Sequence, residues 1–335
     1  MPLKKLLSII VLTILLSACR DHNRNILLAA NDKAAQKNYK VIGIDNFDAF
    51  YSRGEKENNL TGCRQFSNFI FLEGNAGDFQ LLNGLQQLPD VVVHMAAKAG
   101  VLPSLKNPQA YIETNIGVTN NLLEWMSSKQ INKLVFASSS SVYGNNAKVP
   151  FDETDPVNEP ISPYAFTKRS CELMNYAYHE LYSFDIINLR FFTVYGERQR
   201  PDLAIRKFVH NVLAAKPITI YGDGSSARDY TYYSDTVSGI ISAINYVVEN
   251  ENVWEIVNLG NHSPVSLTEL VNTIAEVTEV KPTLIYEDMK PGDVNITYAN
   301  IEKGRALLNY APKVDLRTGL GRFVEWYKQM YVDTL

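Results

Sequence analysis

Residues 162–168 read Ser-Pro-Tyr-Ala-Phe-Thr-Lys, and they carry the signals of a helix start. Ser162 is a favourable N-cap residue, and Pro163 suits the first helical position because its missing N–H would have no partner there. The sequence therefore predicts a helix that begins at Pro163. Tyr164 and Lys168 stand one turn apart on that helix, so their side chains lie on the same face.

A tyrosine and a lysine in this arrangement have the chemistry of an acid/base pair. A phenol ordinarily titrates near pH ~10, which is too high for a base at neutral pH. A neighbouring ammonium stabilises the phenolate and lowers its pKa, which makes a usable general acid and base. Because the same spacing also occurs on ordinary amphipathic helices, the assignment of Tyr164 and Lys168 depends on the neighbouring sequence.

A run of four serines upstream supports the catalytic interpretation. Residues 134–144 read Leu-Val-Phe-Ala-Ser-Ser-Ser-Ser-Val-Tyr-Gly. An apolar run that ends in hydroxyls is typical of a buried strand that stops at a polar site. In open α/β sheets, ligands bind at the carboxyl ends of the strands. A serine hydroxyl there could hydrogen-bond a substrate oxygen beside the Tyr164 phenol, and a serine-rich turn is the alternative.

Together these motifs resemble the extended short-chain dehydrogenase/reductase family, in its nucleotide-sugar epimerase and dehydratase branch. The resemblance extends from about Tyr39 to the C-terminus. The segments SSSSVYG, SPYAFTK and RFFTVYGERQRPD, which begin at residues 138, 162 and 190, are most similar to UDP-glucuronate 4-epimerases. The resemblance implies an α/β fold, with a Rossmann-type doubly wound parallel sheet and a smaller C-terminal substrate-binding lobe. It also implies NAD as the cofactor and a UDP-sugar as the substrate.

The composition is that of an ordinary globular protein, with 46% hydrophobic and 20% charged residues. Its 335 residues suffice for a large hydrophobic core. A net charge of −4 gives no reason to expect binding to nucleic acid. Cys19, Cys63 and Cys171 are scattered along the chain, so neither a disulfide framework nor a metal site is predicted.

Alternating strand and helix patterns divide the chain into three parts. Residues 1–38 form an atypical N-terminus, which is either signal-like or an altered first strand–helix unit. Residues 39–182 are expected to form the NAD-binding Rossmann domain, which ends with the helix that contains Tyr164. Residues 183–335 are expected to form mainly the substrate-binding lobe, partly interleaved with the sheet.

Residues 1–38 admit two interpretations. A basic start, an apolar run over residues 6–16 and small residues before Cys19 are typical of a bacterial lipoprotein signal, which would anchor the protein to a membrane through Cys19. Alternatively, part of the same run is the first buried strand of a parallel sheet. Nucleotide sugars and nicotinamide cofactors are cytoplasmic metabolites, so the resemblance favours the strand and a cytoplasmic protein.

The resemblance also implies a glycine-rich turn after the first strand, which lets backbone N–H groups approach a diphosphate. This chain has no glycine before Gly43, and counting back from Tyr39 places Asp21, Arg24 and Leu27 at the three positions. Side chains would crowd the turn and Asp21 would repel a diphosphate, so weak NAD binding is expected. A shifted reading frame over residues 1–38 and a decayed or repurposed copy both remain as explanations.

The adenosine side of the predicted cofactor site is more complete. Asp45 follows an apolar strand pattern, and an acid at this place would bind the adenosine ribose hydroxyls and favour NAD over NADP. The other cofactor contacts that the resemblance implies are Asn46, Asn75, Ala96, Ala97, Lys98, Asn115, Tyr164 and Lys168.

Substrate contacts are expected mainly after residue 190. An arginine offers a bidentate fork to a carboxylate or phosphate, and the resemblance implies that Arg200, before Pro-Asp, holds a sugar carboxylate. The other substrate contacts that it implies are Ser140, Ser141, Thr193, Phe208, Arg228 and Asp293.

The reaction that the resemblance implies is a transient oxidation at C4 of the sugar. Tyr164 would remove the proton of the C4 hydroxyl, Ser139 would hydrogen-bond that hydroxyl, and Lys168 would lower the pKa of Tyr164 and hold the nicotinamide ribose. NAD would accept the hydride and return it to the other face of the sugar. A homodimer is also expected.

Two other classes of function stay open. A nucleotide-sugar 4,6-dehydratase shares the fold and cofactor but commonly has Asp-Glu after its catalytic serine or threonine, where this chain has Ser140 and Ser141. A non-enzymatic lipoprotein or pseudoenzyme with a defective cofactor loop is the second alternative. This alternative is suggested by the signal-like N-terminus and the missing glycines in residues 1–38.

Overall fold

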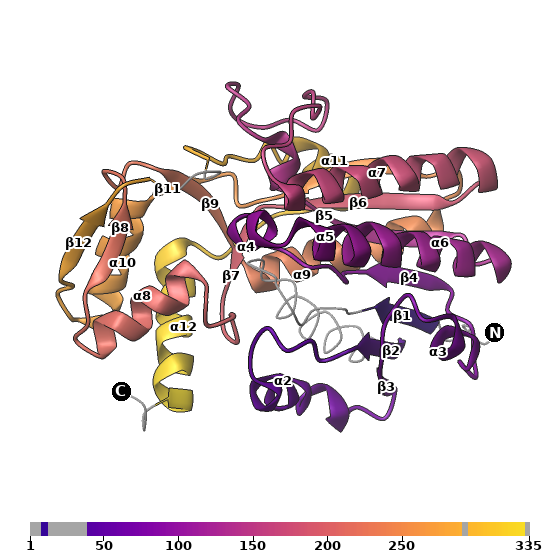
Figure 1. Cartoon of the computed structure of the whole chain (residues 1–335), viewed down its shortest axis with the longest axis horizontal. Helices are drawn as coiled ribbons and strands as arrows, with labels where there is room; N and C mark the ends of the chain where they lie inside the picture. Colours follow the sequence, from indigo (N-terminus) through magenta and orange to yellow (C-terminus); the bar gives the residue numbers. More distant parts are fainter. Residues whose placement is uncertain (1–7, 13–38, 290–293, 332–335) are drawn as a thin grey trace.

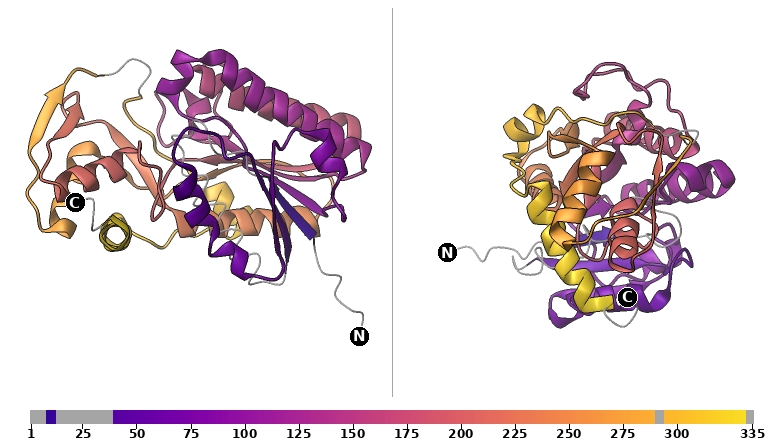
Figure 2. Two further views of the ribbon diagram at one scale, coloured as in Figure 1. Left: turned by 60° about the horizontal axis from the view of Figure 1, so that its bottom comes forward. Right: turned by 90° about the vertical axis from the view of Figure 1, so that its left-hand side faces the viewer.

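The computed structural model describes residues 8–12, 39–289 and 294–331, which form a large α/β lobe and a smaller lobe beside it (Figure 1). Figure 2 shows the larger lobe edge-on, with helices on both sides of a twisted sheet. The smaller lobe lies beyond one end of that sheet. The predicted class, a doubly wound sheet with a smaller C-terminal lobe, is confirmed.

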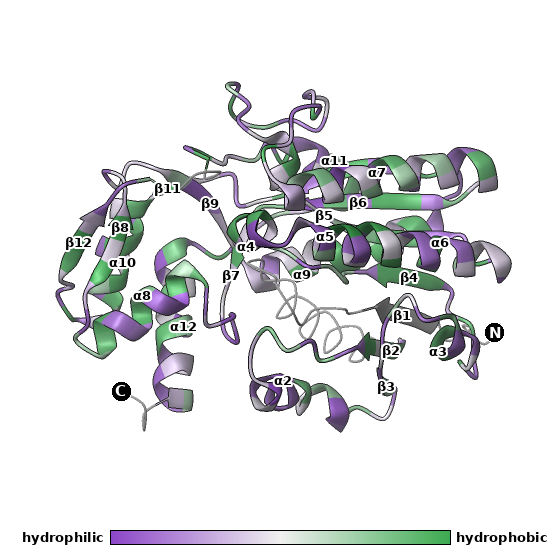
Figure 3. Ribbon diagram, viewed as in Figure 1, coloured by the Kyte–Doolittle hydropathy of each residue, from purple (hydrophilic) through white to green (hydrophobic). Residues whose placement is uncertain are grey.

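The sheet of the larger lobe has seven parallel strands in the order β10-β6-β5-β4-β1-β2-β3. Its strands are β1 Ser8–Leu12, β2 Lys40–Asp45, β3 Phe69–Glu73, β4 Val91–His94, β5 Lys133–Ser139, β6 Asp185–Phe191 and β10 Trp254–Leu259. The strand order reverses beside β1, which makes the carboxyl ends of β1 and β4 the topological switch point where such sheets bind ligands. Strands buried on both faces tend to be apolar runs, and β4, with three consecutive valines, is one (Figure 3). Strand β6 is also buried throughout but contains Asp185, Asn188 and Arg190.

Helices cover both faces of this sheet. The helices are α2 Arg53–Leu60, α3 Phe79–Asn83, α4 Val101–Lys106, α5 Pro108–Tyr111, α6 Val118–Ser128, α7 Pro163–Tyr182 and α9 Tyr233–Glu249, with short turns η1 Cys63–Gln65, η2 Ile112–Gly117 and η3 Ser140–Tyr143. Apolar residues of α6 and α7 pack with one set of strand side chains, and those of α9 pack with the alternate set. The alternation of strand side chains thus divides the core into two layers.

Helix α7 forms as its sequence predicts. The Ser162 hydroxyl accepts a hydrogen bond from the backbone N–H of Ala165 at 3.1 Å, and Pro163 is the first helical residue. The helix ends at Ser183, whose backbone is left-handed with φ 54°. Its inward face is buried against β5 and β6, which places the start of the helix at the carboxyl ends of these strands.

The apolar run near the N-terminus supplies a strand in the middle of the sheet. Residues Ser8–Leu12 pair in parallel with β2 on one side and with β4 on the other. In the structure, part of this run is therefore a strand of the parallel sheet, as the second interpretation predicted. Cys19 and the three positions that lack glycine, Asp21, Arg24 and Leu27, lie outside the described residues. Within the described ranges, no helix has the length and apolar character that crossing a bilayer requires.

The smaller lobe has its own core. Its elements are β7 Thr193–Tyr195, α8 Ala204–Leu213, β8 Ile218–Tyr221, β9 Ala227–Tyr232, β11 Pro264–Ser266, α10 Leu267–Thr278, β12 Leu284–Glu287, α11 Glu302–Leu308 and α12 Leu316–Tyr331. Side chains of α8, α10 and α12 form an apolar cluster separate from the two layers of the larger lobe, although α11 itself packs on α9 and β10. The chain crosses between the lobes more than once, because β6, α9 and β10 belong to the larger one.

The position of β1 yields a test. Replacing Ile10 by proline removes a backbone N–H from the middle of a strand that is paired on both sides. A buried carbonyl left without its partner costs roughly 1–3 kcal/mol, so the free energy of unfolding in urea should fall by at least that amount. Ile10→Val keeps the N–H and should change it little. Equal unfolding midpoints for the two variants would show that these residues do not belong to the sheet.

Candidate active site

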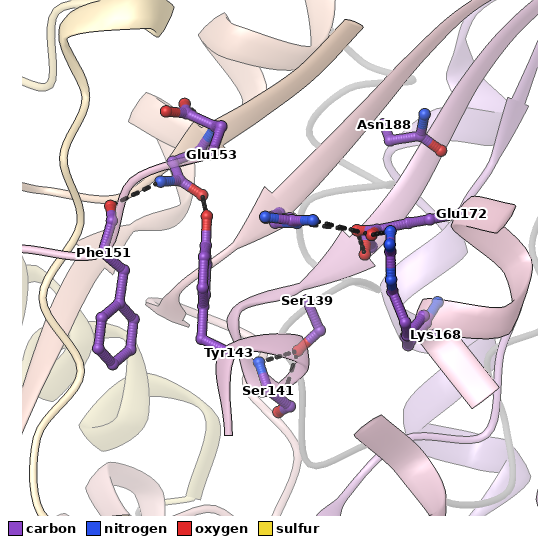
Figure 4. Close-up of polar contacts among 12 residues, drawn as sticks. Ser139, Ser141, Tyr143, Phe151, Glu153, Lys168, Glu172 and Asn188 are labelled. Atoms are coloured by element: carbon purple, nitrogen blue, oxygen red, sulfur yellow. Dashed lines mark hydrogen bonds and ion pairs between the residues drawn. The ribbon is translucent and has the colours of Figure 1, made fainter. Parts of the chain in front are cut away.

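Ser139 is the last residue of β5 and therefore lies at the carboxyl edge of the sheet, where such folds bind ligands. Its Oγ caps the η3 turn by accepting a hydrogen bond from the Ser141 N–H at 3.2 Å, and it lies 3.1 Å from the Ser141 Oγ (Figure 4). Ser140 is half-buried in the same turn. The serine run therefore places hydroxyls at the carboxyl end of β5, and Ser139 is fixed by the turn that follows it.

Tyr164 and Lys168 are each about 1% exposed, and the first turns of α7 bring them to β5 and η3. The Lys168 Nζ donates a 2.6 Å hydrogen bond to the backbone carbonyl of Ala137, two residues before Ser139. The same ammonium lies 5.0 Å from the centre of the Phe136 ring. Lys168, itself a candidate catalytic residue, thus joins α7 to the end of β5 that contains Ser139.

The turn after β4 is held by Asn115. Its side-chain oxygen accepts from the Lys98 N–H at 2.6 Å, and its NH₂ group donates to the Lys98 carbonyl at 2.8 Å and to the Thr167 hydroxyl at 2.9 Å. Ala96 and Ala97, which precede Lys98, are buried with little side-chain bulk. Because the amide of Asn115 is occupied by protein groups, its part in the cofactor site is to shape this turn and join it to α7.

The residues expected on the adenosine side of the site lie at the end of β2 and in the loop after it. Asp45 is buried at the end of β2 and accepts a 2.7 Å hydrogen bond from the Phe47 N–H. Asn46 accepts from the Asp48 N–H at 3.1 Å, and the Asp48 carboxylate forms a 3.2 Å ion pair with Lys98. This ion pair joins the loop after β2 to the turn after β4, on the two sides of β1. Beyond β3, the Asn75 side chain accepts from the Gly77 N–H at 2.9 Å.

Arg200 is the most distinctive of the candidate substrate residues. Its Nε and Nη2 form a bidentate ion pair with Asp202 at 2.8 and 2.6 Å, and its guanidinium lies 4.6 Å from the centre of the Phe50 ring. The side chain is 4% exposed, and its Nη1 has no hydrogen-bond partner among the described residues. A buried donor without a partner is costly unless a ligand fills it. Phe50 comes from the loop after β2, so Arg200 lies where the two lobes meet.

The other candidate substrate residues are dispersed. Thr193 is half-buried at the start of β7. Phe208 is buried in the apolar cluster of the smaller lobe, and Arg228 on β9 donates to the carbonyls of Ala227 and Asn295 at 2.8 and 3.4 Å. Asp293 lies outside the described residues.

The sequence did not reveal a buried ion pair directly behind this site. Glu172 follows Lys168 by one turn on α7, and its carboxylate binds the guanidinium of Arg190 on β6 through two hydrogen bonds of 2.9 Å. Both side chains are almost fully buried. The spacing Lys-x-x-x-Glu within α7 was the available signal, but nothing in the sequence joins it to an arginine on another strand.

The NAD dependent epimerase/dehydratase family matches residues 29–260. This chain belongs to that family. The match begins after the three positions where the chain lacks glycine. Strands β5 and β6 and helix α7 all lie within the matched range.

Individual relatives point in the same direction. A UDP-glucuronate 4-epimerase of Thermodesulfobacterium geofontis is 38% identical over 86% of this chain and 88% of its own. An uncharacterised protein of Methanocaldococcus jannaschii is 45% identical over the same shares. The crystal structure of the UDP-glucuronic acid 4-epimerase of Bacillus cereus with UDP-glucuronic acid and NAD superposes with a TM-score of 0.87, at 33% identity over 97% of this chain and all of that one.

Tyr164→Phe should reduce conversion of a UDP-sugar by ~10²–10⁴-fold, because the variant loses the general acid and base while keeping the ring. The unfolding midpoint should stay close to that of the wild type. Tyr178→Phe is the matched control, since Tyr178 lies near the other end of the same helix and bonds Glu124 on α6. Turnover by the Tyr164 variant at the wild-type rate would remove Tyr164 from the reaction.

Proposed function

We propose that this protein catalyses the NAD-dependent 4-epimerisation of UDP-glucuronate. The observation that carries the proposal is the packing of α7, which bears Tyr164 and Lys168, against β5 and η3, which contain the serine run. A buried arginine, Arg200, lies at the junction of the lobes. A relative that matches 86% of the chain and a solved structure that matches 97% of it are UDP-glucuronate 4-epimerases, which supports the same substrate.

The residues at the ligand edge fit NAD. Asp45 is a buried acid at the end of β2, where a ribose is bound in such folds, and the turn of Ala96, Ala97 and Lys98 lies at the topological switch point. Lys98 adds a positive charge at that turn. NAD, when bound, supplies the chemistry of taking up a hydride from the sugar and giving it back.

The protein's part in the reaction is proton transfer and orientation. Tyr164 removes the proton from the C4 hydroxyl while Ser139 holds that hydroxyl in place by a hydrogen bond. Lys168 stabilises the phenolate that this step requires. After the 4-keto sugar has turned over, Tyr164 returns the proton to the oxygen at C4, and the product differs from the substrate only in configuration at that carbon.

Arg200 is proposed to select the sugar. Its Nη1 is a buried donor without a protein partner among the described residues, and a carboxylate at C5 of the sugar would complete its coordination. The ion pair with Asp202 keeps the guanidinium neutralised and oriented. A neutral CH₂OH group at the same place would leave the charge-assisted bond unmade, so UDP-glucose should bind less well. Arg228 and Asp293 are proposed for the nucleotide part, and Phe208 shapes their lobe from within its core.

The dehydratase alternative is less compatible with the site. A dehydratase needs a second acid/base pair after the catalytic serine, and Ser140 and Ser141 are hydroxyls that do not titrate in the required range. In addition, the Ser141 backbone N–H and hydroxyl both contact Ser139. The pair therefore supports the position of Ser139 and offers no acid for elimination at C5 and C6.

Assembly and location form part of the same proposal. The outer face of α7 exposes Leu173, Tyr176 and Leu181 at helical spacing, and this apolar stripe suits a homodimer formed through α7. Sedimentation of the purified protein tests the dimer. We place the protein in the cytoplasm, because β1 requires part of the signal-like run within the fold. A lipid anchor at Cys19 would have to be found by lipid labelling to overturn this location.

Arg200→Ala should weaken UDP-glucuronate binding by roughly 1.5–3 kcal/mol, the cost of a charge-assisted contact, and should affect UDP-glucose much less. Calorimetric titration of both sugars measures the difference. Arg198→Ala, which removes the same charge two residues away, is the control and should not discriminate between the sugars. Equal losses for both sugars in the Arg200 variant would assign Arg200 to the diphosphate or the loop.

The positions that lack glycine predict a low affinity for NAD. Each non-glycine residue in a strained turn costs about 1–3 kcal/mol, so replacing Asp21, Arg24 and Leu27 by glycine should tighten NAD binding by at least tenfold. Titration calorimetry with NAD measures this, and activity of the unmodified protein should rise on adding NAD. If the unmodified protein is purified with stoichiometric NAD, the alignment of residues 1–38 is wrong.

A further inference from the structure

The carboxylate of Glu172 receives four hydrogen bonds from three surrounding side chains. Its Oε1 accepts from the Ser138 hydroxyl at 2.5 Å and from the Arg190 Nε at 2.9 Å. Its Oε2 accepts from the Arg190 Nη2 at 2.9 Å and from the Arg169 Nη1 at 3.0 Å. A carboxylate has about four lone-pair sites, so these donors fill the coordination of Glu172.

The position of Glu172 gives this coordination a consequence for catalysis. Glu172 and Lys168 are four residues apart on α7, a spacing at which lysine and glutamate side chains ordinarily form ion pairs. An ion pair is not formed here, and the Lys168 ammonium instead donates to the Ala137 carbonyl beside Ser139. Figure 4 shows both side chains on the same helix, with the dashed bonds of Glu172 directed to its other partners.

We propose that Arg190 is a positioning residue that occupies the Glu172 carboxylate and so keeps the Lys168 ammonium available to Tyr164. The inference rests on the proposed function, in which Lys168 stabilises the Tyr164 phenolate. Without Arg190, Glu172 would have two open acceptor sites in a buried environment. Arg169 already binds the Glu172 Oε2, so the further cation one turn away on α7 is Lys168. Its transfer to Glu172 would withdraw the charge that the phenolate needs.

Arg190 is well suited to this role because it is held from both sides. Its guanidinium lies 4.8 Å from the centre of the Tyr143 ring, in a cation–π contact. The Tyr143 hydroxyl donates to the Asn258 side chain at 2.7 Å, and the Asn258 NH₂ group donates to the Phe151 carbonyl at 3.0 Å. Tyr143 belongs to the η3 turn that also contains Ser141, so the arginine joins this turn to α7 through Glu172.

The charges around Lys168 are consistent with this role. Burial, followed by the charge of Lys168, lowers the pKa of His94 on β4 to about 3, so this ring is neutral at working pH. Burial raises the pKa of the Cys171 thiol on α7 to about 11. Burial also opposes ionisation of Glu172, but the hydrogen bonds and charge of Arg190 and the bond from Ser138 more than offset it and lower the pKa of that carboxyl.

The other acidic and phenolic groups on elements packed against α7 have partners of their own. Glu124 on α6 bonds Tyr178, and Asp185 on β6 forms an ion pair with Lys133. Burial raises the pKa of Tyr143 on η3, so its phenol stays protonated. Glu113 on η2 is exposed and bonds Gln109. The phenol of Tyr111 on α5 donates to the Ala99 carbonyl at 3.0 Å. Among these described neighbours, Glu172 is the buried carboxylate one turn from Lys168 on α7, and Arg190 binds it.

The test reads the titration of Tyr164 in the full chain without sugar or NAD. The tyrosinate absorbance of each variant is compared with that of the same variant carrying Tyr164→Phe, so that Tyr164 alone contributes to the difference. Arg190→Met should raise the pKa of Tyr164 by about 1–3 units, because the phenolate loses a close cation. Arg190→Met combined with Glu172→Gln should return it to near the wild-type value, because a neutral amide does not capture Lys168.

The pH profile of epimerisation provides a second measurement. Tyr164 must be deprotonated to act as a base, so kcat/KM falls as the pH drops below its pKa. A raised pKa therefore moves the acid limb of the profile to higher pH in Arg190→Met, and Glu172→Gln in the same chain should move it back. The titration needs no substrate, so it holds whether the enzyme acts on UDP-glucuronate or on another sugar.

Controls separate this role from a loss of stability. Asp185→Asn breaks the ion pair with Lys133 at the opposite ends of the same two strands, β5 and β6, and should leave the Tyr164 titration unchanged. If Arg190→Met does not fold, Arg169→Met replaces it, because Arg169 is partly exposed and also binds Glu172. It should produce a smaller shift in the same direction. An unchanged Tyr164 pKa, or a shift that Glu172→Gln does not reverse, overturns the proposal.

Discussion

The hydrogen bond from the Lys168 ammonium to the Ala137 carbonyl is the contact on which the site depends. It is a buried, charge-assisted bond, and such bonds are short and strong where water is excluded. The carbonyl belongs to β5 and the ammonium to α7, so one contact fixes the helix that bears Tyr164 against the strand that ends in Ser139. In the proposed mechanism, Tyr164 and Ser139 are thus positioned by the same group whose charge stabilises the Tyr164 phenolate.

A buried ammonium that donates to a neutral carbonyl is sensitive to an anion nearby. Coulomb interactions grow as the local dielectric falls, so an open carboxylate one turn away would compete strongly with a neutral carbonyl. The fold places Glu172 at that distance and then surrounds it with Arg190, Arg169 and Ser138. The ion pair contributes little as a source of stability, because burying two charges costs much of what their attraction returns. Its effect on the charge distribution around Lys168 gives it a clearer physical role.

Local signals in the sequence predicted the elements of the site and not their side-chain partners. Ser162 and Pro163 predict the start of α7, and the apolar run before Ser139 predicts β5, because capping and periodicity are properties of neighbouring residues. The pairing of Glu172 with Arg190 and the clamp of Asn115 on Lys98 join residues from different elements, so no local pattern contains them. The run that supplies β1 is ambiguous for another reason, since a short apolar segment fits a buried strand and a signal sequence equally well.

The two halves of the cofactor site are supported by different parts of the chain. Asn115 binds the turn after β4 to Thr167 on α7, and this clamp consists of side-chain bonds that involve no residue of the missing glycine-rich turn. Asp48 and Lys98 likewise hold the adenosine loop to that turn across β1. The turn after β4 and the loop after β2 are thus held by contacts among described residues, at positions far along the chain from 21–27. Two parts of the predicted cofactor site therefore share a support that includes the helix bearing Tyr164, since Asn115 bonds both Lys98 and Thr167.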